Sequence, residues 1–242
     1  MDIFEIISGI ITIAFVIVNF ILGFKIALTF RKRNDIEFIF VGISWFGIAF
    51  PLIPDVLVFV FNLTTPNIPG NALIILYAVF NIILIPAIVL LWLIALTNLL
   101  QVQFKLRRVI LIIYCILSGI LEILFFYFLI TDISIIGNLG SNPYQVIWSS
   151  LSDIILVSNL IIVLLTGILF ARVLLQSTEK EMILRGKLLM IAFITFVIGS
   201  LIDMVLTTAI SNVIARSILI LSSIEFYLGF IFPKIAQNIL MK

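Results

Sequence analysis

The chain has 242 residues, of which 64% are hydrophobic and only 11% are charged, with a net charge of +2 and a mean hydropathy of +1.39. An average soluble domain is about half apolar and about one quarter charged, so this composition excludes a soluble globular domain and a disordered chain. We therefore expect the partner of this protein to be the lipid bilayer and not nucleic acid.

The apolar residues are grouped in seven continuous stretches. A helix needs about 20 apolar residues to cross about 30 Å of hydrocarbon, and the stretches have about that length. Their continuity argues against a lipid-facing β-barrel, whose strands alternate. Asp2 and Glu5 precede the first stretch without a basic residue, so we expect it to be retained rather than cleaved as a signal peptide. The prediction is one all-α domain over 1–242, a seven-helix bundle with spans at about 6–29, 38–61, 72–97, 109–130, 151–171, 188–206 and 213–232.

Basic residues occupy every second connection between these spans. The connections without Lys or Arg are 62–71, 131–150 and 207–212. Because Lys and Arg are enriched in cytoplasmic loops, the pattern predicts an external amino terminus, a cytoplasmic carboxyl terminus and a multi-pass protein of the cell membrane. The basic residues of the other connections and of the segment after the last span are Arg31, Lys32, Arg33, Lys105, Arg107, Arg108, Arg172, Lys180, Arg185, Lys187, Lys234 and Lys242.

Two of the connections are long enough to have a role of their own. Segment 131–150 carries Trp148 where an interfacial aromatic anchor would sit. Segment 172–187, "RVLLQSTEKEMILRGK", is rich in helix-forming residues and is predicted to extend the fifth and sixth helices into the cytoplasm. We expect a cytoplasmic signalling partner, if there is one, to contact this second segment.

The second and sixth spans resemble each other. "GIAFPLIPDVL" (47–57) and "VIGSLIDMVL" (197–206) each place an Asp near the outer end of a span that follows a basic connection. The similarity predicts two three-helix units joined by the fourth helix, an internal 3+1+3 repeat. Chance similarity between two apolar helices is the alternative.

Charged residues inside the spans are the main candidates for a site, because a charge at the bilayer centre costs at least about 2.5–3.5 kcal/mol. In "SLIDMVLTTAISNVIARS" (200–217), Asp203 ends one span and Arg216 begins the next. The short turn puts both at one level, so we expect an ion pair. The pair either pins the two helices together or lets Arg216 recruit an anionic ligand, since a guanidinium binds carboxylates in a bidentate fork.

Asp55 and Asp153 are predicted to lie at the same level, on the second and fifth helices. Three acids against one arginine leave an excess of negative charge there. Water, protonation of a carboxyl, or a bound cation or amine could balance it, and the alternative is that both acids simply reach the aqueous surface.

Polar side chains recur along the third and fifth helices and predict an internal cavity. Tyr77 and Asn81 share a face with Trp92, and Asn159 lies between two further polar residues at seven-residue spacing, Ser152 and Thr166. Prolines at positions 51, 54 and 86 are expected to kink the second and third helices beside this stripe. With the charged residues above, the predicted ligand-binding set is Asp55, Tyr77, Asn81, Asn159, Asp153, Asp203 and Arg216.

Two more acidic residues lie deeper in the predicted spans. Glu225 is nine residues after Arg216, on the opposite side of its helix, and Glu122 is on the fourth helix. We interpret both as buried titratable groups. They either relay protons or donate interhelical hydrogen bonds in their protonated form.

The composition also argues against several seven-helix enzymes. The chain has no histidine and a single cysteine, Cys115. Zinc-dependent membrane hydrolases need histidine ligands, and haem carriers usually do. No phosphate loop or nucleophile elbow is present either. We expect no enzyme activity, no metal site, no haem and no internal disulfide.

In its number and orientation of spans the chain resembles microbial rhodopsins and G-protein-coupled receptors. The last span, "ARSILILSSIEFYLGFIFPK", has no central lysine for a retinal Schiff base, so we expect no retinal. The receptor motifs are absent, because the corresponding places read "LTNLLQVQF" and "GFIFPKIAQ". The chain is more similar to uncharacterised archaeal or microbial heptahelical proteins and to the seven-helix sensor regions of histidine kinases.

These patterns favour a receptor-like sensor that binds a small polar or amphipathic ligand in an outward-facing pocket. One alternative is a small-solute or proton-coupled transporter in which Glu225 or Glu122 titrates. The other is a structural membrane subunit without a ligand.

Overall fold

A computed structural model describes residues 3–64, 70–140, 146–206 and 208–233 of the chain. Within these residues, seven helical segments are long and apolar enough to cross a bilayer, which confirms the predicted seven-helix architecture. The largest difference from the predicted bounds is in the sixth span, which begins at Lys180 instead of residue 188. The segments are Ile3–Arg33, Glu37–Leu63, Gly70–Leu99, Phe104–Thr131, Ser150–Leu175, Lys180–Val205 and Ala209–Ile231.

Prolines divide two of the spans into shorter elements, as their positions predict. The second span changes to a 3₁₀ turn at Pro51, and the third contains a π-helical turn just before Pro86, where an amide is missing. The helices are α1 (Ile3–Leu28), α2 (Phe30–Arg33), α3 (Glu37–Gly47), α4 (Ile53–Thr64), α5 (Gly70–Ala78), α6 (Leu84–Leu99), α7 (Phe104–Thr131), α8 (Ser150–Leu175), α9 (Lys180–Val205) and α10 (Ala209–Ile231), with short turns η1 (Phe50–Leu52), η2 (Val79–Ile83) and η3 (Ile133–Ile135).

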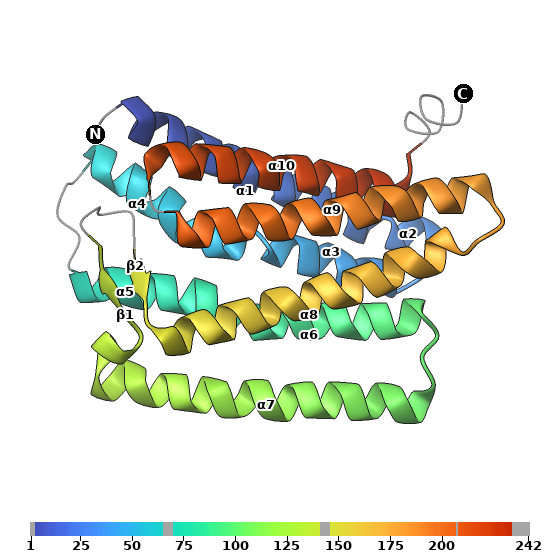
Figure 1. Cartoon of the computed structure of the whole chain (residues 1–242), viewed down its shortest axis with the longest axis horizontal. Helices are drawn as coiled ribbons and strands as arrows, with labels where there is room; N and C mark the ends of the chain where they lie inside the picture. The colour runs from blue at the N-terminus through green and yellow to red at the C-terminus, as the bar shows by residue number, and fades with distance from the viewer. Residues whose placement is uncertain (1–2, 65–69, 141–145, 207, 234–242) are drawn as a thin grey trace.

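Six of the spans form the bundle, and the fourth lies at its edge. Helices α1, α3, α6, α8, α9 and α10 pack one against the next, and α10 closes the ring against α1 (Figure 1). Helix α7 packs on α6 from outside, and Phe125 is its buried residue. The fourth span therefore contributes little to the interior of the bundle.

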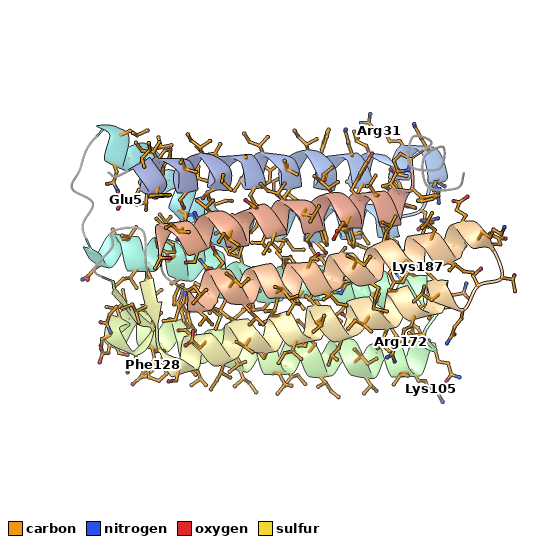
Figure 2. The ribbon with its side chains drawn as sticks, turned by 45° about the horizontal axis from the view of Figure 1, so that its top comes forward. Glu5, Arg31, Lys105, Phe128, Arg172 and Lys187 are labelled. Carbon is orange, nitrogen blue, oxygen red and sulfur yellow. The ribbon has the colours of Figure 1, made fainter. Side chains whose placement is uncertain are left out.

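The two ends of the bundle differ in charge. One end carries a two-stranded antiparallel sheet, β1 (Gly137–Leu139) with β2 (Val146–Trp148), within the segment predicted as a loop. We call it the sheet end; residues 141–145 lie outside the described chain. Figure 2 shows Arg31, Lys105, Arg172 and Lys187 gathered at the opposite end, which we call the basic end. The predicted basic residues 234 and 242 are outside the described residues.

The half of the bundle nearer the basic end is filled with apolar side chains. Phe38, Leu96, Leu189 and Phe230 belong to one buried cluster there. On its α1 side the backbones approach closely, since a Cβ added at Gly42 would lie 2.6 Å from the Gly23 carbonyl oxygen. Such close approach through small residues is typical of helix packing in membranes.

Segment 172–187 is helical on both sides of a short turn, as predicted. Helix α8 continues to Leu175 and α9 begins at Lys180. The Arg185 side chain reaches across and donates to the carbonyl oxygens of Gly229 and Phe230 in the last turn of α10. Carbonyls at a helix end have no intrahelical partner, so Arg185 caps α10 and joins it to α9.

Candidate ligand-binding site

A cavity of about 240 Å³ lies between the helices in the sheet half of the bundle. It extends from Trp148 on β2 and Asn212 on α10 to Trp45 and Trp92, deeper in the bundle. Pockets for drug-sized ligands have volumes of about 300–1,000 Å³, so this cavity suits a smaller molecule. Trp148, predicted as an interfacial anchor, forms part of the cavity wall.

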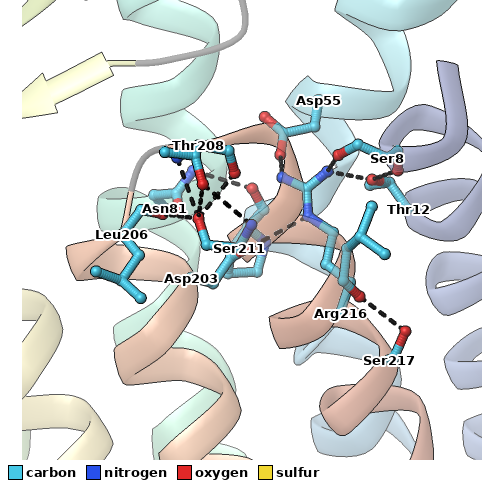
Figure 3. A network of polar contacts seen from close by, with 12 residues as sticks. Ser8, Thr12, Asp55, Asn81, Asp203, Leu206, Thr208, Ser211, Arg216 and Ser217 are labelled. Atoms are coloured by element: carbon cyan, nitrogen blue, oxygen red, sulfur yellow. Dashed lines mark hydrogen bonds and ion pairs between the residues drawn. The ribbon is translucent and has the colours of Figure 1, made fainter. Parts of the chain in front are cut away.

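Arg216 is the centre of a polar network beside this cavity (Figure 3). Its Nε donates to Asp203 Oδ1 at 3.2 Å, as the sequence predicted, and its Nη2 donates to Asp55 Oδ2. Its Nη1 donates to the hydroxyls of Ser8, at 3.3 Å, and Thr12. One guanidinium thus joins α1, α4, α9 and α10. Arg216 is only 5% exposed, so this junction lies inside the bundle.

Asp55 is held from two sides. It lies in the first turn of α4, just after the 3₁₀ turn, and is 8% exposed. Its Oδ2 accepts from Arg216, and its Oδ1 accepts from the Tyr77 hydroxyl on α5. Hydrogen bonds to a charged group are about twice as strong as neutral ones, so this carboxylate is fixed in orientation.

The turn before α10 sets the height of Arg216. Thr208 caps the helix, with its hydroxyl accepting from the Ser211 amide at 3.1 Å while the Ser211 hydroxyl accepts from the Thr208 amide. This reciprocal pair satisfies two amides that the helix leaves free. Arg216 therefore starts one to two turns inside the sheet end, opposite Asp203.

The deep wall of the cavity is aromatic. Trp45 stacks on Phe226 with ring centroids 3.5 Å apart and lies 6.3 Å from the Phe196 ring. Trp92 lies 5.5 Å from Phe193, and its Nε1 donates to the Thr166 hydroxyl at 2.9 Å. The cavity therefore has a charged upper part and an apolar, aromatic lower part.

The predicted stripe of the third helix faces this cavity, and Asn159 is the member of the fifth-helix stripe that lines it. Tyr77, Asn81, Trp92 and Asn159 all line it. The Asn81 side chain donates to the Pro51 carbonyl at 3.3 Å, beside the break between α3 and α4. Asn159 accepts from the Tyr114 hydroxyl at 2.8 Å. Both amides are thus oriented by neighbouring helices.

Asp153 was predicted to belong to the same charged group, but it does not line the cavity. Its neighbour Ser152 points inward, with its hydroxyl donating to the Ile136 carbonyl at 2.8 Å, and one residue turns the helix by about 100°. Asp153 is half-buried in the first turn of α8, where a negative charge stabilises the helix dipole. The cavity wall contains two acids rather than three.

Glu225 and Glu122 also lie outside the cavity wall. Glu225 is half-buried between α9 and α10, and its Oε2 accepts from the Thr195 hydroxyl at 2.9 Å. Glu122 is half-buried on the peripheral helix α7. Within the described residues, no group of three or more His, Cys, Asp or Glu side chains is placed to hold a metal ion.

Several residues of the site were not predicted, and Ser8, Thr12 and Trp45 are examples. Ser8 and Thr12 lie four residues apart in the apolar first span, and this spacing could have indicated a polar face. Trp45 gave no signal, because it is surrounded by apolar residues that do not indicate which side of the span is internal.

The comparisons with known proteins add no family to this description. No family model matches the chain, and no curated protein has a sequence that matches it.

Proposed function

We propose that this protein is a receptor-like membrane sensor that binds a small polar or amphipathic ligand in the cavity. The observation that carries the proposal is the cavity of about 240 Å³ with Asp55, Asp203 and Arg216 in its wall. Intramembrane charges are costly, and a fully packed bundle would need neither the charges nor the space.

The proposed orientation places the basic end in the cytoplasm and the sheet end outside. Figure 2 supports it, because the labelled Arg and Lys side chains all lie at one end. Among the described residues, Arg216 is the one Lys or Arg in the sheet half. The positive-inside rule then gives an external amino terminus and a cavity that faces outward.

The peripheral position of α7 supports the proposed 3+1+3 repeat, in which the fourth helix only connects two units. The ring of sequential neighbours likewise supports the resemblance in topology to other heptahelical bundles.

In the proposed mechanism, a ligand beside Asp203 changes the balance of contacts around Arg216. That guanidinium joins four helices, so a ligand that favours one arrangement of the network selects one packing of α9 and α10. Helix α9 runs to the basic end, where Arg185 holds α10. The α8–α9 connection within 172–187 is the proposed contact for a cytoplasmic signalling partner.

A small-solute or proton-coupled carrier is less favoured by the geometry. The basic half is closed by packed side chains such as Phe38 and Phe230, and neither Glu225 nor Glu122 lines the cavity. A carrier would drive solute uptake into proteoliposomes under a pH gradient, and Glu225→Gln would abolish that uptake. A structural subunit would instead purify with a stable partner.

A compound screen tests whether the cavity binds ligands. Purified protein in nanodiscs is heated with a panel of small amines, carboxylates, sugars and nucleosides, in parallel with Ser200→Phe, which fills the cavity. We expect some compounds to raise the unfolding temperature of the natural chain but not of the variant. If no compound of any class distinguishes the two proteins, the proposed binding function is wrong.

A labelling experiment tests the orientation. In a Cys115→Ser background, Thr131→Cys at the sheet end should react with a membrane-impermeant maleimide on intact cells. Thr178→Cys, in the α8–α9 turn, should react only after permeabilisation. The opposite pattern would reverse the proposed topology.

A further inference from the structure

One carboxylate oxygen in the charged upper part of the cavity is available to a ligand. Asp203 lines the cavity and uses Oδ1 for Arg216, whereas its Oδ2 accepts no hydrogen bond from the described residues. Its side chain is 20% exposed. The charged residues of the cavity wall are Asp55, Asp203 and Arg216, so the ionised wall carries one net negative charge.

The same geometry disfavours an anionic ligand. A guanidinium has five N–H groups, and Arg216 already donates hydrogen bonds to Asp55, Asp203, Ser8 and Thr12. One N–H on Nη2 is left for an anion, and an anion bound there would lie beside two carboxylates. A group that donates hydrogen bonds and carries positive charge meets the free oxygen without breaking any of them.

One face of α9 connects this oxygen to the aromatic part of the cavity. Phe196, Ser200 and Asp203 all line the cavity, and their spacing of four and three residues puts them on one side of the helix. Seven residues correspond to about 10 Å along the axis. A molecule of about that length can place a cation at Asp203 and an apolar body against the aromatic rings.

A second unmet polar group lies at the aromatic end. The indole Nε1 of Trp45 is buried and, within the described chain, has no hydrogen-bond partner. Trp45 lines the cavity and is only 2% exposed. An indole N–H is solely a donor, and a buried donor without an acceptor costs about 1–3 kcal/mol. A ligand oxygen at this end would satisfy it.

We infer that the cavity takes a small organic cation: a protonated amine that binds Asp203, joined through an apolar or aromatic body to a hydrogen-bond acceptor that binds Trp45. This inference rests on the proposed binding function and names its ligand class. Aromatic walls suit such a ligand, because they bury its apolar or aromatic body.

Four matched probes test the inference. Tyramine carries an amine and a phenol; tyrosol replaces the amine by a hydroxyl; 3-(4-hydroxyphenyl)propionate replaces it by a carboxylate; 2-phenylethylamine lacks the phenol oxygen. Each is titrated by calorimetry into protein in nanodiscs, with empty nanodiscs as the control for partition into lipid. We expect tyramine to bind at least about tenfold more tightly than tyrosol or the carboxylate, and about fivefold more tightly than 2-phenylethylamine.

Two variants assign the ends of the ligand. Asp203→Asn keeps an oxygen for Arg216 but removes the charge, so tyramine should lose at least about tenfold in affinity and bind no better than tyrosol. Trp45→Phe keeps the ring stacked on Phe226 but removes the N–H, so tyramine and 2-phenylethylamine should become equal. Ser217→Ala, an exposed neighbour of Arg216, is the matched control and should change nothing.

The results that would contradict the ligand class differ from those that would contradict the proposed binding function. If tyrosol or the carboxylate binds as tightly as tyramine, or more tightly, the inferred cationic ligand class is wrong, but the cavity still binds ligands. Binding of none of the four probes by a protein that other compounds of the screen stabilise also overturns it. If the screen itself finds no compound, the binding function and the ligand class fail together.

Discussion

The two halves of this bundle are built from the same spans, but their interiors differ. In the basic half, residues such as Leu189 and Phe226 are fully buried in an apolar cluster, and none of the charged residues described there is buried. In the sheet half, Arg216 and Asp55 are almost as deeply buried, and they border a cavity of about 240 Å³.

The difference separates stability from binding. Close packing of apolar side chains holds helices together without regard to ligands, whereas a buried ion pair is weak evidence for stability because the loss of hydration offsets its attraction. We therefore assign structural stability to the basic half, and the proposed ligand recognition belongs to the sheet half. The predictions below test this division, from the largest expected effect to the smallest.

The largest effect is expected from an aromatic residue in the packed half. Phe226→Ala removes a ring that stacks on Trp45 and contacts Phe193, and should lower the free energy of unfolding by about 3–5 kcal/mol. Phe196 is half-buried in the cavity wall, so Phe196→Ala should lower the free energy of unfolding by less than half as much. Unfolding in mixed micelles measures both, and equal losses would contradict the division.

The next effect comes from the centre of the network. Arg216→Met leaves the Asp55 carboxylate buried without its cation, and should cost about 3 kcal/mol. Combining it with Asp55→Asn removes the second charge and should recover part of the loss. The same unfolding assay tests both, and a double variant less stable than Arg216→Met alone would show that this pair is not the source of the cost.

Added volume should distinguish the two halves directly. Ala192→Phe inserts a ring where no surface is exposed, and should destabilise the protein by about 1–3 kcal/mol. Ser200→Phe inserts the same ring beside the cavity, so unfolding should change by about 1 kcal/mol or less while tyramine binding is lost. A large destabilisation by Ser200→Phe would mean that the space is not available to a ligand.

The smallest effect is expected at the turn that sets the height of Arg216. Thr208→Ala removes the cap of α10 and should cost about 1 kcal/mol. Thr208→Ser keeps the hydroxyl and serves as the control; its unfolding free energy should remain close to that of the natural chain.

The spans and the nearest ion pair could be predicted because they depend on local order along the chain. Asp203 and Arg216 lie on either side of one short turn, so their pairing follows from sequence spacing alone. The break in the second span at Pro51 could be predicted for the same reason, because a proline disrupts a helix at its own position.

The rest of the network depends on how each helix is rotated about its axis. Asp55 is 161 residues from Arg216, and Thr12 is 204 residues away. Helices that are apolar on all sides do not indicate which face is internal, and this is why Asp153 was assigned to the cavity and Trp45 was missed. A single residue step separates the fully buried Ser152 from the half-buried Asp153.

The most direct test of the division is the reactivity of cysteines placed in the two halves. In a Cys115→Ser background, Ser200→Cys in the cavity wall and Ala171→Cys in the packed half are treated with a small, water-soluble, positively charged methanethiosulfonate. We predict that Ser200→Cys reacts at least about tenfold faster than Ala171→Cys, which has no exposed surface. Equal rates, or a faster reaction at position 171, would contradict a cavity confined to the sheet half.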